Sequence, residues 1–178
     1  MMRAPMFGKL SASEEILLPV KPAYLMVTLF SALMINLLPL TGWVLALRPD
    51  CVALVLLYWG IYQPRKIGFL PAWLLGLAMD VADGSLFGQH ALAYSVMMFA
   101  AIALHRRVSM FDMRHQMLHV LPLLLITQLI VLGVRQAAGD AFPGWWYFVS
   151  SITGALLWPA MDMLLKIPLR QRTDPDEA

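Results

Sequence analysis

Long apolar segments separated by short polar turns run along almost the whole of this chain. The pattern predicts six membrane-crossing helices, at roughly residues 23–47, 51–63, 68–82, 91–104, 117–134 and 145–167. At 1.5 Å per residue the first and last reach ~35 Å, whereas the second, third and fourth reach only ~20 to 25 Å, less than the ~30 Å hydrocarbon core. The helices of the short segments are expected either to extend into the flanking residues or to pack inside the bundle. Four full spans with a re-entrant hairpin are the structural alternative.

Composition supports a membrane protein. Of the 178 residues, 60% are apolar and only 13% are charged, against about 25% charged residues in soluble chains. The first apolar run begins after Lys21 and is too long for a cleavable signal sequence, so it is expected to stay as an anchor. We therefore predict an all-α, polytopic membrane bundle of about six helices. Its domains are a cytoplasmic leader (1–22) that is either interfacial or disordered, a six-span domain (23–167) and a cytoplasmic tail (168–178).

The basic residues predict the orientation. With six spans, two of them, Arg48 and Arg135, fall on one side of the membrane. The other eleven fall on the opposite side: Arg3, Lys9, Lys21, Arg65, Lys66, Arg106, Arg107, Arg114, Lys166, Arg170 and Arg172. By the positive-inside rule, both termini are cytoplasmic and the aspartates near the other side face outward. The cytoplasmic basic loop that contains Arg106, Arg107 and Arg114 is a candidate membrane-surface patch.

Several classes of function lack their residues. A net charge of +2 without a continuous basic face argues against nucleic acid as a partner. The four histidines fall on both sides of the membrane and cannot share one metal ion, and no cofactor motif is present. Asp80, Asp83 and Gly84 match the opening of the CDP-alcohol phosphotransferase motif, but Phe87 and Gly88 stand where that motif needs Ala and Arg. We therefore expect no enzyme activity and no metal site.

The third predicted helix contains the strongest candidate site. Gly76, Asp80, Gly84 and Gly88 are each four residues apart, which on a continuous helix makes one ridge of small residues interrupted by a carboxylate. An acidic group at membrane depth marks a packed interface or a partner. Asp80 is thus either a partner-binding residue or an internal packing and capping residue. Because Asp83 and Gly84 also form a turn signal, the helix could instead end there and leave Gly88 in the loop.

Other polar residues suggest local pairings. Arg48 is the outer cation nearest the aspartates in sequence, so we hypothesise an Arg48–Asp80 ion pair. Asp50 is expected to cap the second helix. Asp162 and Lys166, one turn apart, are expected to neutralise each other.

Taken in order along the chain, these features resemble one known family. The resemblance extends from the first span to the last and rests on Arg48-Pro49-Asp50, Leu57-Tyr58-Trp59, Pro64-Arg65, Gly76, Asp80, Gly84-Ser85, Gly88 and Leu157-Trp158-Pro159. It is similar to the rod shape-determining protein MreD family of Gram-negative bacteria. The leader before Lys21 is the part that fits least well.

The resemblance implies an inner-membrane subunit of the elongation machinery, without a catalytic site. Its implied partners are MreC, the actin-like MreB, and RodA with its class B penicillin-binding protein. It also implies a fold like that of the substrate-binding subunits of energy-coupling-factor transporters, with six spans around a central pocket.

Two functions follow as hypotheses. The first is a scaffold in which an outer groove near Asp80, Gly84 and Gly88 receives MreC, while the basic turn faces anionic lipid or MreB. The alternative is a membrane subunit of transporter type that binds a small molecule or a lipid. Against that alternative, few polar side chains are expected to converge outside the Asp80 region.

Overall fold

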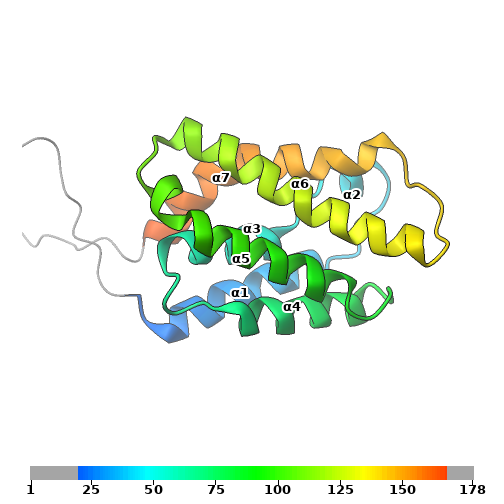
Figure 1. Ribbon diagram of the computed structural model, residues 1–178, viewed down its shortest axis with the longest axis horizontal. Helices are drawn as coiled ribbons and strands as arrows, with labels where there is room; N and C mark the ends of the chain where they lie inside the picture. The colour runs from blue at the N-terminus through cyan, green and yellow to red at the C-terminus, as the bar shows by residue number, and fades with distance from the viewer. Residues whose placement is uncertain (1–19, 168–178) are drawn as a thin grey trace, which may run out of the picture.

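The computed structural model describes residues 20–167, and these form an all-helical bundle (Figure 1). No strand occurs in this range. The elements are α1 (Pro22–Asn36), α2 (Trp43–Leu47), α3 (Cys51–Tyr62), α4 (Phe69–Ala82), α5 (Gln89–Ser109), α6 (Met113–Ala137), the 3-10 turn η1 (Trp145–Phe148) and α7 (Val149–Lys166). The predicted fold class, a helical membrane bundle, is confirmed, although the leader and tail lie outside the described residues.

Among the described residues, three helices are long and apolar enough to cross a membrane. They are α5, α6 and the continuous segment Trp145–Lys166. The apolar helices α1, α3 and α4 are shorter, with 15, 12 and 14 residues. The prediction that the fourth segment is short was wrong, because α5 extends through the polar residues His105, Arg106 and Arg107 to reach 21 residues. Apolarity alone therefore underestimated a helix whose last turn is basic.

The first predicted span is broken into two helices. Its α-helix ends at Asn36, and the short α2 begins only at Trp43. Pro39 has no backbone N–H and disfavours helical geometry at Leu38, while Gly42 has a φ of +67°. A proline inside an apolar segment predicts a bend at that residue, but α1 stops three residues before Pro39.

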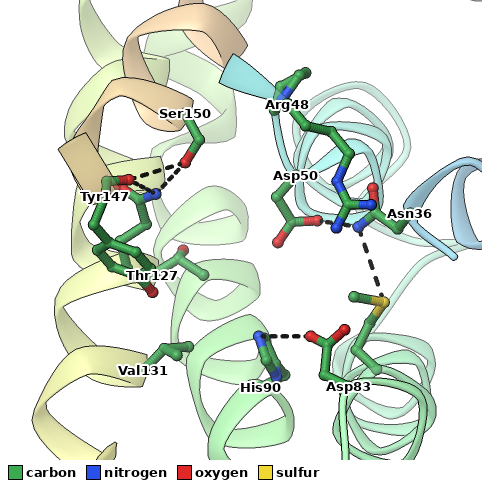
Figure 2. A pocket seen from close by; sticks show the side chains of 12 residues that line it. Asn36, Arg48, Asp50, Asp83, His90, Thr127, Val131, Tyr147 and Ser150 are labelled. Atoms are coloured by element: carbon green, nitrogen blue, oxygen red, sulfur yellow. Dashed lines mark hydrogen bonds and ion pairs between the residues drawn. The ribbon is translucent and has the colours of Figure 1, made fainter. Parts of the chain in front are cut away.

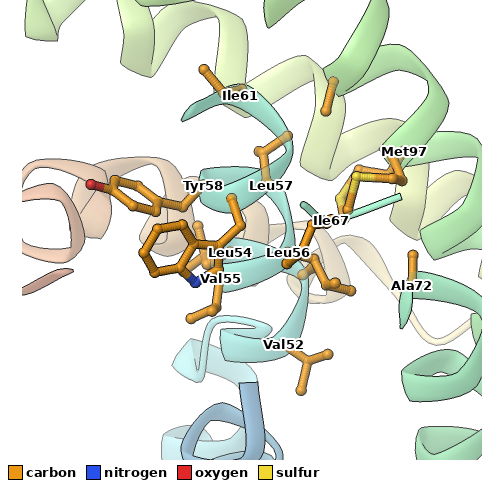
Figure 3. Packing of buried hydrophobic residues seen from close by; sticks show 14 of the residues in the cluster. Val52, Leu54, Val55, Leu56, Leu57, Tyr58, Ile61, Ile67, Ala72 and Met97 are labelled. Atoms are coloured by element: carbon orange, nitrogen blue, oxygen red, sulfur yellow. The ribbon is translucent and has the colours of Figure 1, made fainter. Parts of the chain in front are cut away.

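The central element is α3, which neighbouring helices surround. Ten of its 12 residues are buried, from Val52 to Ile61, and it contacts α1, α5, α6 and α7. A helix that is apolar around its whole circumference is stable only when covered on all sides. Figure 3 shows its side chains packed among Ile67, Ala72 and Met97. This short segment is therefore the core of the bundle.

The bundle has two chemically different ends. At one end lie the α5–α6 turn, the start of α1 and the end of α7, and we call it the basic end (Figure 1). At the other end lie the α4–α5 turn, α2 and the chain that connects α6 to η1. The candidate functional site lies at this second end.

Candidate functional site

Asp50 joins three helices at the second end of the bundle. Its Oδ1 accepts hydrogen bonds from the backbone N of Ala53 at 3.0 Å and from Asn36 Nδ2 at 2.8 Å. Its Oδ2 accepts from the Tyr94 hydroxyl at 2.6 Å. Asn36 Oδ1 in turn accepts from the backbone N of Cys51 at 3.0 Å. The predicted capping role of Asp50 is confirmed, and the same carboxylate also ties α1 and α5 to the start of α3.

Asp80 closes the turn between α4 and α5. The side chain is buried, at 1% exposure. Its Oδ2 accepts from the backbone N of Gly88 at 2.7 Å, and its Oδ1 accepts from the backbone N of His90 at 2.9 Å. His90 Nδ1 lies 2.8 Å from the same Oδ1. Asp80 thus satisfies the free N–H groups at the start of α5 from a neighbouring helix.

The predicted continuous ridge of small residues was wrong. Helix α4 ends at Ala82, and Gly84 adopts a φ of +58° just beyond it. The Gly84 N bonds to the Val81 carbonyl and the Ser85 N to the Asp80 carbonyl, at 3.3 and 3.1 Å, which is a Schellman ending. Because the chain reverses there, Gly84 and Gly88 lie in the turn and not on α4. The alternative based on the turn signal is the one that the structure bears out.

Of the three glycines in that pattern, Gly76 is the one at which two helices approach closely. A Cβ atom at Gly76 would lie 2.4 Å from the Cα of Ala91 and 2.5 Å from its N, both on α5. At Gly84 and Gly88 a Cβ would meet nothing within 4 Å. The close contact of α4 with α5 therefore depends on the missing side chain at Gly76.

The hypothesised Arg48–Asp80 ion pair does not form. Arg48 Nη1 instead donates to the Leu38 carbonyl at 3.1 Å, in the segment between α1 and α2. The first turn of α5 follows the tight α4–α5 turn directly and covers Asp80. The partner of the Asp80 carboxylate is therefore His90, from this turn, and not Arg48. Sequence separation alone could not show which cation or ring would lie nearest.

A hollow opens beside these residues, and we call it the polar funnel. It consists of an inner pocket of about 130 Å³ and a wider mouth of about 570 Å³. The residues that line both parts are Arg48, Asp83, His90, Val131, Tyr147 and Ser150. Figure 2 shows them around an open space between the α6–α7 side and the α1–α4 side of the bundle. The expectation that few polar side chains converge here outside the Asp80 region was wrong.

Gln128 was missed by the sequence reasoning and holds one wall of the funnel. Its Nε2 donates to the Tyr147 carbonyl at 3.0 Å and contacts the Ser150 hydroxyl. Its Oε1 accepts from the Ser151 hydroxyl at 2.5 Å. A lone amide side chain inside an apolar segment was the available signal, because such groups in membrane helices need polar partners.

The basic end carries its own polar cluster. Arg106, Arg107 and Arg114 are exposed on and beside the α5–α6 turn. The predicted ion pair is present, with Lys166 Nζ 2.8 Å from Asp162.

Gln116, which the sequence reasoning also missed, joins α6 to α3 and α7 at this end. Its Oε1 accepts from the Tyr62 hydroxyl at 3.0 Å and from Trp158 Nε1 at 3.1 Å. Within residues 20–167, no group of three or more His, Cys, Asp or Glu side chains is placed to hold a metal ion.

Comparison with known proteins agrees with the sequence pattern. The family model for rod shape-determining protein MreD matches residues 20–167. Rod shape-determining protein MreD from Haemophilus influenzae is 31% identical over 120 residues, which cover 67% of this chain and 74% of that protein. No solved structure matches the chain, so the likeness to energy-coupling-factor subunits stays a prediction.

Proposed function

This chain belongs to the family of rod shape-determining protein MreD, and we propose that it acts as a non-enzymatic scaffold subunit of a complex in the bacterial inner membrane. Membership of this family implies that the chain is a membrane protein and that it has a role in rod-shape determination. The observation that carries the proposal is the extent of the match, because the family model covers every residue of the described bundle. A scaffold also needs exposed apolar helix faces for lipid and for partner helices, and α1 offers one with Met26, Val27 and Phe30.

In the proposed topology the chain crosses the membrane six times and both termini are cytoplasmic. The distribution of eleven basic residues against two supports this orientation. The start of α1 and the end of α7 lie at the same end of the bundle as Arg106 and Arg107, as an even number of crossings requires. Helices α3 and α4 are short for a full crossing. Burial of α3 among its neighbours removes the need for it to match the lipid thickness by itself.

We propose that MreC binds at the α4–α5 turn. Two apolar side chains project from this turn: Leu86 is 44% exposed and Phe87 is 73% exposed. Asp80 and Gly76 are buried against the start of α5 and fix the position of the turn. They therefore contribute to MreC binding indirectly, by positioning Leu86 and Phe87. MreB, RodA and the class B penicillin-binding protein are the other proposed members of the complex, which would support lateral peptidoglycan synthesis.

The exposed arginines at the opposite end provide a second proposed contact. Arg106, Arg107 and Arg114 lie on and next to one turn at the side that the charge rule places in the cytoplasm. Juxtamembrane basic residues attract anionic lipid at about 1 kcal/mol each. We propose that this surface contacts the membrane in preference to MreB.

Copurification with MreC tests the scaffold proposal. We expect tagged wild-type protein to recover MreC from a rod-shaped host, and Phe87→Ala to reduce that recovery at least fivefold at an unchanged protein level. Phe99→Ala is the matched control, because Phe99 is equally exposed at 72% but lies on α5, away from the turn. Equal recovery of MreC by wild type and Phe87→Ala would contradict the proposed surface. Failure of the wild type to recover MreC would contradict the proposed scaffold.

A further inference from the structure

The polar funnel contains hydrogen-bond donors that the protein itself leaves unused. Two of the carboxylates beside it are occupied: Asp50 accepts three hydrogen bonds, and both oxygens of Asp80 are bonded to the start of α5. Arg48 uses one guanidinium N–H for the Leu38 carbonyl, although a guanidinium has five. Arg135 lines the mouth and forms no ion pair with any described residue. These two arginines are the same two that the charge distribution places on this side of the membrane.

We infer that the polar funnel binds a phosphate group, carried by a lipid headgroup or free in solution, through Arg48 and Arg135. Guanidinium groups donate paired N–H bonds in a geometry that suits phosphate oxygens. The mouth volume of about 570 Å³ falls within the range of small-molecule sites. Trp146 and Tyr147 line the mouth and offer aromatic surface against which the organic group attached to the phosphate can pack. This inference is separate from the scaffold role, because the funnel walls and the exposed α4–α5 side chains are different residues.

Four other titratable groups line the same space, namely Asp50, Asp83, His90 and Tyr147, and the carboxylates among them set a limit on anion affinity. Asp83 lines both parts of the funnel, and its carboxylate repels an anion. His90 Nε2 lies 4.0 Å from Asp83 Oδ2, while its Nδ1 faces Asp80. A bound phosphate near Arg48 and Arg135 would therefore gain from neutralising Asp83. We expect Asp83→Asn to tighten phosphate binding severalfold.

Isothermal titration of the full-length protein in a neutral maltoside detergent tests the inference. The probes are inorganic phosphate, dihexanoyl phosphatidic acid, and dihexanoylglycerol, which has the same tails without the phosphate. We expect saturable binding of at least one phosphate probe, with about one site per chain, and no binding of dihexanoylglycerol. Binding of phosphatidic acid alone would identify a lipid headgroup, and comparable binding of inorganic phosphate would identify the free anion as a sufficient ligand.

Three variants place the binding in the funnel. Arg135→Gln and Arg48→Gln should each weaken binding about tenfold or more, since a hydrogen bond to a charged group contributes about that factor. Arg106→Gln, at the basic end, is the matched control and should change the affinity less than twofold. Arg135 holds no described partner, so Arg135→Gln tests the site even if the loss of the Arg48–Leu38 bond disturbs folding.

Three results would overturn the inference. The first is that neither phosphate probe binds the wild-type protein. The second is that dihexanoylglycerol binds as tightly as phosphatidic acid. The third is that Arg106→Gln weakens binding as much as Arg135→Gln does, because the affinity would then come from general attraction to basic surface. A wild-type protein that binds phosphate but recovers no MreC would separate this inference from the scaffold proposal.

Discussion

The two ends of this bundle satisfy buried polar groups in different ways. At the funnel end, Asp50 and Asp80 accept hydrogen bonds from backbone N–H groups at the starts of α3 and α5, as well as from neighbouring side chains. At the basic end, the described polar groups bond no backbone N–H at a helix start: Gln116 and Asp162 pair with Tyr62, Trp158 and Lys166, and Gln116 also donates to the Phe111 carbonyl.

The difference has a consequence for what each end can bind. The carboxylates of Asp50 and Asp80 are occupied by helix-start N–H groups and neighbouring side chains and not by an arginine, so Arg48 and Arg135 keep unused donors that face a polar hollow. At the basic end, the cation Lys166 is occupied by Asp162, and the hollow between α6 and α7 that touches Arg114 is lined otherwise by apolar side chains such as Leu118 and Ile152. Helix starts that occupy the carboxylate oxygens of Asp50 and Asp80 therefore leave the arginines at this end with unused hydrogen-bond donors.

Replacing Asp80 should produce the largest loss of stability. Asp80→Leu removes the acceptor for two backbone N–H groups of α5, and a hydrogen bond to a charged group is worth about 1.5 to 3 kcal/mol. We expect the free energy of unfolding to fall by roughly 3 to 5 kcal/mol, measured by thermal unfolding in detergent micelles.

Asp83→Leu is the control for Asp80→Leu, since it makes the same change three residues later on an exposed side chain. It should cost less than about 1 kcal/mol. If Asp80→Leu were no worse than Asp83→Leu, backbone capping would not distinguish the funnel end.

Filling the space at Gly76 should cost slightly less. In Gly76→Ala, the new Cβ would lie 2.4 Å from the Cα of Ala91, and the obstacle is backbone that no rotamer change can move. We expect α4 and α5 to separate and the free energy of unfolding to fall by about 3 kcal/mol, measured in the same way.

The matched substitution for Gly76→Ala is Gly133→Ala on α6, where a Cβ meets nothing within 4 Å. That change should be neutral or stabilising by up to about 1 kcal/mol, because alanine favours helix over glycine. Similar effects at both glycines would mean that the α4–α5 contact is not close in the folded protein.

The smallest of the three effects is expected at the basic end. Gln116→Leu leaves the Tyr62 hydroxyl and Trp158 Nε1 without their shared acceptor. Because Tyr62 is only partly buried and can find water, we expect a loss of about 2 kcal/mol, less than at Asp80. Gln136→Leu, on the exposed end of the same helix, should change the unfolding midpoint very little. An effect of Gln116→Leu larger than that of Asp80→Leu would reverse the comparison between the two ends.

Local sequence signals predicted much of the architecture. The apolar segments, the capping role of Asp50 and the Asp162–Lys166 pair all follow from spacing within a few residues. Their partners are near in sequence, so little else needs to be known. The break after Asn36 was only partly predicted, because Pro39 indicates a bend but does not fix where the helix ends.

The errors fall where distant segments meet. The spacing of Gly76, Asp80, Gly84 and Gly88 has the helical period, yet a turn divides the four residues into a packing position, a cap and two turn positions. Opposite charge made a pairing of Arg48 with Asp80 plausible. The chain reverses between α4 and α5, however, and this reversal places His90 next to Asp80. Charge complementarity does not reveal distance.

By itself, the sequence determined that this protein is an apolar helical bundle, and it predicts most of the positive charge on one side of the membrane, because hydropathy and charge act residue by residue. It also identified the MreD family, from motifs spread over the whole chain. Only the tertiary structure decided that Gln128, Tyr147 and Ser150 from the α6–α7 side face Arg48 and His90 across one hollow. The physical reason is that a cavity is the space left between helices. The size of that space depends on how closely pairs of helices such as α4 and α5 approach each other, and the sequence of a single segment does not specify this distance.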